Sequence, residues 1–213
     1  MKLDKMQQTA SGGQLLLIFS DETRLKAPTF VAADFALFPG KELTDDEMQA
    51  LRAAVSKART RERAVRSIAA SALSEKELSK RLVQKGASET DAQEAVDWLR
   101  ELRLLDDAET ARQLAQSAAA KGYGASRIRS ILYEKGIPRE FWDEAMTDLP
   151  QSDGAIDKFL HQRLDGRALD DKMIKKTVDA LLRRGHSWRD IDAGLRRYRE
   201  GLSFSAEGLE EME

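Results

Sequence analysis

Apolar residues along most of this chain recur at three- and four-residue intervals, which is the spacing of the buried face of an amphipathic helix. From Thr44 onward this pattern is broken only by short polar stretches, and three of the breaks are alike. Each has a leucine four residues before a basic–glycine stop: Leu82 with Gly86, Leu132 with Gly136, and Leu181 with Gly185. Recurrence at a period of about 50 residues predicts a tandem array of one helical unit.

Aligning the three glycines gives each unit three helices. The first helices are expected over 59–72, 107–121 and 154–165, the second over 75–85, 125–135 and 171–184, and the third over 89–102, 138–147 and 187–199. The expected fold is mainly α, a tandem array of three three-helix repeats in an elongated, curved molecule, because stacked repeats make extended concave surfaces. The expected parts are an N-terminal part at 1–56, repeats at 57–104, 105–150 and 151–200, and an acidic C-terminal tail at 201–213.

The N-terminal part has a different pattern. Residues 1–13 end in a Thr-Ala-Ser-Gly-Gly run and are expected to form a loose leader. Gln14–Phe19 and Phe30–Phe38 are rich in aliphatic and aromatic residues, and Pro28 and Pro39 limit the strands that they can form. A small β-hairpin-like extension of two or three strands is therefore expected here, followed by a linker helix.

Helix starts and stops carry residues that satisfy free backbone groups. Thr44 and Ser74 are each followed three residues later by glutamate, which is the spacing of a capping box. Aspartate pairs at 106–107 and 170–171 follow leucine at expected helix starts, where carboxylates cap the helix and interact favourably with its dipole. The three stop glycines are expected to end their helices in a left-handed turn.

The alignment of the repeats also predicts their cores. Positions four and three before each glycine share a helix face, so both are expected to be buried: Leu82, Leu132 and Leu181 at the first position, and Val83, Tyr133 and Leu182 at the second. Thr177 occupies an otherwise apolar position in the third unit, where Val178 and Ile174 are expected to pack instead. A small residue nine positions after each glycine should let the third helix approach closely: Ala95, Ala145 and Gly194. The tryptophans of the third helices are expected in the core: Trp98, Trp142 and Trp188.

Composition narrows the class of protein. The 213 residues are 41% hydrophobic and 34% charged, and no apolar run reaches the roughly 20 residues of a membrane span. Cysteine is absent, which excludes disulfides and thiolate metal sites and favours a cytosolic protein. The net charge is −2, but four glutamates lie in the last ten residues, so the body of the chain is mildly basic. This balance permits a polyanionic partner without requiring one.

The chain offers little for catalysis or metal binding. His161 and His186 are the only histidines; they have no second ligand at metal-binding spacing and are expected to be ordinary, half-exposed side chains. The Gly122-Tyr123-Gly124 segment lacks the lysine and hydroxyl residue that end a P-loop, and no strand precedes it, so a tight interhelical turn is expected. No catalytic residue, cofactor site or metal site is predicted, and the protein is not expected to be an enzyme.

Basic side chains are the remaining candidates for function. Arg127 and Arg129 begin a helix, where the helix dipole disfavours them, so contact with a partner is one interpretation. Arginines also cluster over 59–66, at 183–184 and at 196–199, the last including an aromatic residue suited to phosphate and base contacts. A solvated helix face has the same appearance. The predicted partner-binding residues are Arg127, Arg129, Lys135, Arg183, Arg184, Arg196 and Arg197.

A specific combination of motifs lies in the second unit: Leu104-Leu105-Asp106-Asp107, then a helix, then Gly122-Tyr123-Gly124, Arg127-Ile128-Arg129, Leu132 and Lys135-Gly136-Ile137. This combination resembles the centre of the RecX family, bacterial regulators of the RecA recombinase. A further set upstream is similar to the first repeat of that family: Ser74, Glu77, Leu78, Leu82, Lys85 and Gly86. The resemblance covers about residues 59–199, and the third unit is the loosest in sequence.

The resemblance implies an all-helical array that lies in the groove of the RecA filament on single-stranded DNA and bridges its protomers. It implies inhibition of ATP hydrolysis, strand exchange and repressor cleavage by RecA, with no chemistry of its own. The expected partners are the RecA filament and, as a further candidate, DNA itself; a cytoplasmic monomer is expected. Two alternatives stay open: a helical protein that binds DNA or RNA directly, with affinity that falls steeply as salt rises, and a solenoid-type scaffold for another protein.

Overall fold

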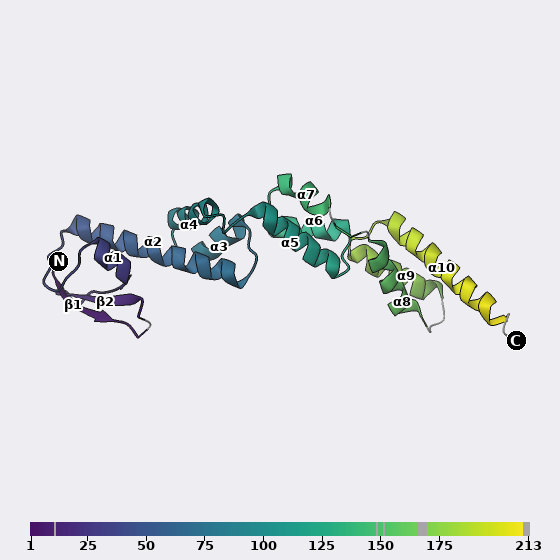
Figure 1. Cartoon of the computed structure of the whole chain (residues 1–213), viewed down its shortest axis with the longest axis horizontal. Helices are drawn as coiled ribbons and strands as arrows, with labels where there is room; N and C mark the ends of the chain where they lie inside the picture. The colour runs from purple at the N-terminus through teal and green to yellow at the C-terminus, as the bar shows by residue number, and fades with distance from the viewer. Residues whose placement is uncertain (11, 148, 151, 166–169, 211–213) are drawn as a thin grey trace. The chain divides into compact units, whose positions relative to one another are not determined.

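The computed structural model describes residues 1–10, 12–147, 149–150, 152–165 and 170–210, with residues 202–210 described by their backbone alone. The chain divides into two units, Met1–Leu105 and Asp106–Glu213. The first unit holds a small antiparallel sheet and the first repeat, and the second unit holds the second and third repeats (Figure 1). The mainly helical fold with a small β extension is confirmed.

The sheet has three strands in the order β1-β2-β3: β1 (Leu3–Gln8), β2 (Gln14–Phe19) and β3 (Arg24–Pro28). The expectation of a loose leader is wrong, because β1 pairs with β2 along nearly its full length. An irregularity in the register between Leu3 and Lys5 breaks the alternation of apolar and polar residues there, so the sequence pattern of a strand is obscured.

Phe30–Phe38 does not form the expected strand. Helix α1 (Thr29–Asp34) begins directly after Pro28, which ends β3. Val31 is buried and Phe35 is partly buried against the same core, and this spacing of four residues is helical. Aromatic and β-branched composition therefore gave the wrong prediction where the spacing of apolar residues indicated a helix.

Helix α2 (Asp45–Ala70) is one continuous element. The linker helix and the first helix of repeat 1 were expected as separate pieces, and α2 joins them through residues 56 and 57. The N-terminal half of α2 packs Leu51 and Val55 against the sheet, and its C-terminal half contributes Ala64 to the core of repeat 1. Helices α3 (Glu75–Gln84) and α4 (Glu89–Glu101) complete that repeat.

The two later repeats follow the expected helix order. Repeat 2 consists of α5 (Asp107–Ala120), α6 (Ala125–Glu134), the short 3₁₀-helix η1 (Arg139–Phe141) and α7 (Trp142–Thr147). Repeat 3 consists of α8 (Asp153–Leu164), α9 (Asp171–Arg183) and α10 (Trp188–Glu210). The last helix thus continues through the expected acidic tail as far as Glu210, and residues 211–213 lie outside the described residues.

Each repeat buries its own core, and the expected leucine is at its centre each time: Leu82, Leu132 and Leu181 are all 0% exposed. Val178 packs in the third core as expected, while the hydroxyl of buried Thr177 donates to the Met173 carbonyl. The small residues nine positions after the glycines are buried too. A Cβ on Gly194 would lie 2.5 Å from Ile156 on α8, which shows how closely α8 and α10 approach.

The position three before each glycine is not part of the core. Val83, Tyr133 and Leu182 are 37%, 69% and 41% exposed. In α3 and α6 the buried stripe is only one residue wide, with Leu78 and Leu82 as its members in the first repeat. The neighbouring position is about 100° further round the helix, so it faces out of the repeat.

The tryptophans divide in a similar way. Trp98 and Trp142 are partly buried against the cores of repeats 1 and 2, and the Trp142 indole donates to the Ile137 carbonyl. Trp188 is 63% exposed, so its expected place in the core is wrong. It is the first residue of α10, one turn before the helix reaches the repeat core at Ile191.

Candidate functional site: the joint between repeats 2 and 3 and its basic side chains

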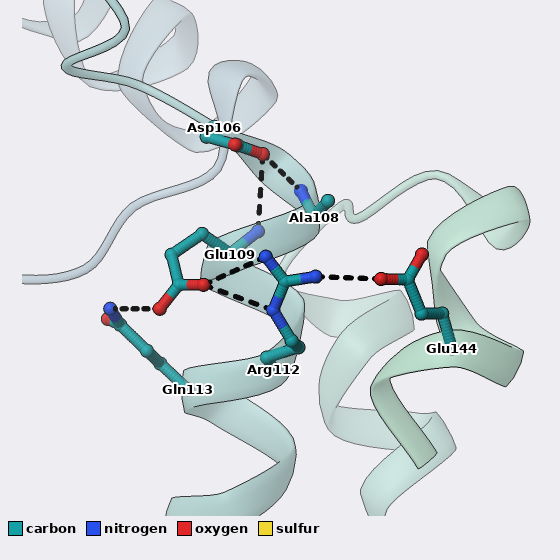
Figure 2. A network of polar contacts seen from close by, with 6 residues as sticks. All are labelled: Asp106, Ala108, Glu109, Arg112, Gln113 and Glu144. Atoms are coloured by element: carbon teal, nitrogen blue, oxygen red, sulfur yellow. Dashed lines mark hydrogen bonds and ion pairs between the residues drawn. The ribbon is translucent and has the colours of Figure 1, made fainter. Parts of the chain in front are cut away.

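The aspartate pairs act as helix caps. The Asp106 carboxylate accepts hydrogen bonds from the backbone N–H groups of Ala108 and Glu109 at the start of α5 (Figure 2). Asp170 accepts from the backbone N–H of Met173 at the start of α9. Both carboxylates satisfy donors that a helix start leaves free, so the capping interpretation is confirmed.

A polar network beside Asp106 holds repeat 2 together. Figure 2 shows the Arg112 guanidinium between Glu109 of its own helix α5, at 2.9 Å, and Glu144 of α7, at 2.8 Å. Hydrogen bonds from Gln113 and Arg112 lower the pKa of the Glu109 carboxyl, and Glu109 raises the pKa of Arg112. These groups are exposed, so the network orients α7 on α5 and adds little to stability.

Two glycines interlock where repeat 2 meets repeat 3. Gly124, just before α6, donates its N–H to the Arg184 carbonyl at 2.9 Å, and Ser126 donates to the Gly185 carbonyl at 3.2 Å. A Cβ on Gly124 would lie 2.3 Å from the Gly185 oxygen, and a Cβ on Gly185 would lie 2.3 Å from the Arg127 nitrogen. We call the contacts between residues 121–127 and 184–186 the joint.

The joint pairs two helix ends of opposite polarity. The carbonyls of Arg184 and Gly185, directly after α9, accept from the backbone N–H groups of Gly124 and Ser126, so the turn that ends α9 satisfies a free donor in the first turn of α6. The expected interhelical turn at Gly122-Tyr123-Gly124 is confirmed, with φ of 74° at Gly122. Arg127 is at the positive start of α6, but it also abuts the negative end of α9, so its position costs less than the sequence suggested.

His186 and Arg184 complete the joint. His186 is only 5% exposed, so the expectation of a half-exposed imidazole is wrong for this residue. Its Nε2 lies 3.1 Å from the Gly122 carbonyl, which can only accept, so Nε2 carries the hydrogen. Burial lowers the pKa of His186, which keeps the ring neutral. The Arg184 guanidinium donates to the Lys121 carbonyl at 3.3 Å and lies 4.7 Å from the ring centre of Phe159.

His161 fits the expectation of an ordinary side chain. It is exposed on α8, and its Nδ1 lies 3.1 Å from the Asp165 carboxylate. Its ring also packs edge-on against Tyr198, with the ring centres 5.1 Å apart. Within the described ranges, no three His, Asp or Glu side chains gather closely enough to hold a metal ion.

Most of the predicted partner-binding residues have partners inside the protein. Arg127 pairs with Glu134 at 2.9 Å, and Arg196 pairs with Asp192 at 2.7 Å. Arg197 donates hydrogen bonds to Asp157 through two guanidinium nitrogens, and Asp157 is the main cause of the raised pKa of Arg197. Together with Arg184, these side chains make contacts within unit Asp106–Glu213, and Lys135 is the C-cap residue of α6.

Arg129 and Arg183 differ from the others. Both are exposed, and neither has a hydrogen bond or ion pair with any residue that the structure describes. Arg129 lines a cavity beside the joint, and Arg183 lines a groove of about 360 Å³ on α8 and α9, together with Arg163 and Lys176. Among the described residues, the groove therefore has three basic side chains and one acidic side chain, Asp179.

The arginines of 59–66 are largely occupied within repeat 1. Arg61 lies over the Trp98 ring, 5.0 Å from its centre. Arg63 donates to the Lys85 carbonyl at 2.8 Å and so satisfies the end of α3. Arg66 is 3.5 Å from Glu62 one turn away. Sequence clustering alone did not distinguish such side chains from free ones.

These observations define a helical-repeat protein, with basic side chains along it and no helix in its described part that is long and apolar enough to cross a membrane. Two segments match family models: residues 61–99 match "RecX, first three-helix domain", and residues 106–146 match "RecX, second three-helix domain". The chain is 32% identical to Regulatory protein RecX of Cronobacter sakazakii, over 64% of this chain and 90% of that one. It is 31% identical to Regulatory protein RecX of Vibrio parahaemolyticus, over 56% and 78%.

The chain belongs to the RecX family, whose members are regulatory proteins and not enzymes. Solved structures agree on the fold. A crystal structure of regulatory protein RecX aligns with a TM-score of 0.66 at 20% identity, over 90% of this chain and 97% of the other. The structure of RecX from Lactobacillus salivarius aligns with a TM-score of 0.57 at 18% identity, over 67% and 96%.

Proposed function

We propose that this protein binds the RecA filament on single-stranded DNA and inhibits ATP hydrolysis, strand exchange and RecA-stimulated repressor cleavage. The observation that supports this most strongly is membership of the RecX family over most of the chain. The proposal places the protein in the cytoplasm, where the filament assembles, as a monomer that lies in the filament groove. The elongated, curved shape expected from the sequence stays a prediction.

Repetition of a binding unit gives this mechanism its physical basis. Each repeat has a core of its own, so each can present a contact to a polymer that is itself repetitive. Weak contacts that are linked in one chain act at high effective concentration, and their combined affinity exceeds that of any one contact. A protein held in the groove excludes a second DNA, which blocks strand exchange without any chemistry.

We infer that Arg129 and Arg183 are the strongest of the predicted contact residues. Both are exposed cations without a partner among the described residues, so a charged partner would not have to displace an internal ion pair. Arg127, Arg196 and Arg197 would first have to leave the carboxylates Glu134, Asp192 and Asp157. Lys135 and Arg184 stay candidates at the ends of α6 and α9.

The first prediction tests these two residues with RecA present. The variant Arg129→Glu/Arg183→Glu should need an about tenfold higher concentration to inhibit the single-stranded-DNA-dependent ATPase of RecA, because like charges would face the partner. The measurement is ATP hydrolysis by RecA at substoichiometric ratios of this protein. The variant Arg24→Glu/Lys26→Glu, on exposed residues of β3, changes the net charge equally and should inhibit like the original chain.

Two results would decide against the proposal. If the unmodified protein leaves RecA ATPase unchanged at all ratios, regulation of RecA is wrong, and the two other classes of function become the better explanations. A direct nucleic-acid binder would instead bind bare DNA tightly and lose affinity steeply with salt. If both double variants inhibit equally, regulation stands and the assignment of Arg129 and Arg183 is wrong.

A further inference from the structure

A cavity of about 650 Å³ lies beside the joint, between the residues of repeats 2 and 3. Its volume is within the range of small-molecule binding sites in proteins. The first turn of α6, the end of repeat 2, the start of α8 and the start of α10 all contribute to its wall. The interlocked glycines bring these four segments together, because any side chain at Gly124 or Gly185 would push the two repeats apart.

The described wall of this joint cavity is largely apolar, and Tyr123 and His186 contribute aromatic rings to it. Tyr123 lies half-buried, and Ile128, Met146 and Leu149 add aliphatic surface. His186 forms part of the same wall, and its polar atoms are enclosed in the joint. An apolar wall with an aromatic face suits a flat, hydrophobic group, since nucleobases of any sequence stack on aromatic side chains.

In the described part of its wall, the joint cavity has three charged side chains, and they limit the chemistry of its occupant. Arg129 and Lys158 are exposed cations, and neither has a hydrogen bond or ion pair with a residue that the structure describes. Among the described residues of the lining, Asp190 is the one carboxylate, half-buried at the start of α10. Two cations and one carboxylate complement a group that has an anionic end and a hydrogen-bond donor on an apolar body.

We propose that the joint cavity binds a nucleotide unit, with the base against Tyr123 and the phosphate at Arg129 and Lys158. The amino group of the base donates to Asp190, and cytosine offers such an amino group on its base-pairing edge. The unit comes from single-stranded DNA or from a free nucleotide. An aromatic side chain of a protein partner would fill the apolar space but would leave both cations without a counter-charge. This inference does not rest on regulation of RecA.

The experiment compares two labelled oligonucleotides that have equal numbers of phosphates: (dC)12, and a 12-mer in which abasic sites replace every base. Fluorescence anisotropy of the full-length chain, without RecA and at one salt concentration, should give an about tenfold higher affinity for (dC)12, because only (dC)12 offers a base to stack. Preference for (dC)12 over (dT)12 should fall in Asp190→Ala. The variant Arg129→Glu/Lys158→Glu should weaken binding of both the (dC)12 and the abasic 12-mer.

A variant that fills the cavity separates base binding from general charge. Ala125→Trp, at an exposed residue in the lining, should bring the affinities for (dC)12 and the abasic 12-mer together. Ala120→Trp is the matched control, because Ala120 is an exposed residue of the neighbouring helix α5 and is absent from the lining. Equal circular dichroism and melting temperatures of the two variants confirm that both are folded.

The outcomes distinguish a free nucleotide, a DNA strand and a protein side chain as occupants of the joint cavity. Competition by millimolar dCMP would identify free nucleotides as able to enter, and its failure beside a base-dependent affinity would identify the strand as the source. Equal affinity for (dC)12 and the abasic 12-mer in the unmodified protein would overturn the proposal, since phosphates alone would then account for binding. Absence of binding to either strand, with RecA inhibition intact, would also overturn it and favour a protein side chain in the cavity.

Discussion

Gly86 in the first unit and Gly185 in the second end their helices in the same way. Their φ angles are 89° and 85°, and each N–H donates to the carbonyl three residues earlier at 2.9 Å. The following residue in each case donates to the buried leucine four before the glycine, which is the hydrogen-bond pattern of a Schellman motif. The surroundings differ: a Cβ on Gly86 would meet nothing within 4 Å, while one on Gly185 would lie 2.3 Å from the Arg127 nitrogen.

One sequence motif therefore has two roles in this protein. At Gly86 the motif ends a helix, and the Lys85 carbonyl before the glycine accepts from the Arg63 side chain of the same repeat. At Gly185 the same turn also exposes carbonyls that accept from the start of α6, so it joins two repeats. Local hydrogen bonding fixes the turn in both places, and only the tertiary contact decides how much a change would cost.

Alanine substitution should give the largest difference in stability between the two glycine positions. Gly86→Ala should cost about 1–2 kcal/mol, which is the cost of an L-residue in the left-handed region. Gly185→Ala should cost more than about 4 kcal/mol, because the same strain is joined by a clash with the backbone of α6. Urea unfolding of the full chain, followed by circular dichroism, measures both. Equal costs would mean that the joint does not form in solution.

The residues before the stop should give the next largest contrast. Leu132→Ala should destabilise the protein by about 2–5 kcal/mol, because it removes a fully buried side chain from the core of repeat 2. Tyr133→Ala should change stability by no more than about 0.5 kcal/mol, since that side chain is 69% exposed. The midpoint of thermal unfolding distinguishes them, and a large effect at Tyr133 would restore the original prediction that both positions are core.

The residue after the glycine should give a smaller contrast, in how stability depends on pH. This residue is Ala87 in repeat 1, which does not titrate, and His186 in repeat 3, which does. Burial lowers the pKa of His186 from 6.5, and the nearby Arg184 lowers it further. The Gly122 carbonyl and Asp190 raise this pKa and so oppose part of the effect. Below pH 6.5 the unfolded chain therefore binds a proton that the folded protein resists. The free energy of unfolding should then fall as pH falls through this range.

Substitution of His186 separates its part of the pH dependence of stability from the part that comes from the carboxylates. The stability of His186→Gln should depend less on pH just below 6.5 than that of the unmodified chain, because glutamine does not titrate. Unfolding free energies from urea titrations at several pH values give the comparison, and identical slopes for the two proteins would mean that folding does not lower the pKa of His186.

The sequence predicted best where local chemistry decides. The Thr44 capping box, the caps at Asp106 and Asp170, and the positive φ of the stop glycines all follow from hydrogen bonds within a few residues. It was wrong where a neighbouring segment decides, as in the exposure of Tyr133 and the pairing of the N-terminal strand with β2. Of the predicted partner-binding arginines, Arg197 illustrates the limit, because its partner Asp157 lies 40 residues away.

The sequence was enough to predict the leucine at the centre of each repeat, the stop glycines and the RecX motifs, since each depends on spacing along a short stretch of chain. It did not predict that α10 continues to Glu210. Tertiary structure alone decided which arginines are free, which glycines interlock and where a cavity opens. The physical reason is that a turn closes with its own backbone, whereas an ion pair, a clash or a cavity needs a second segment whose position no local pattern records.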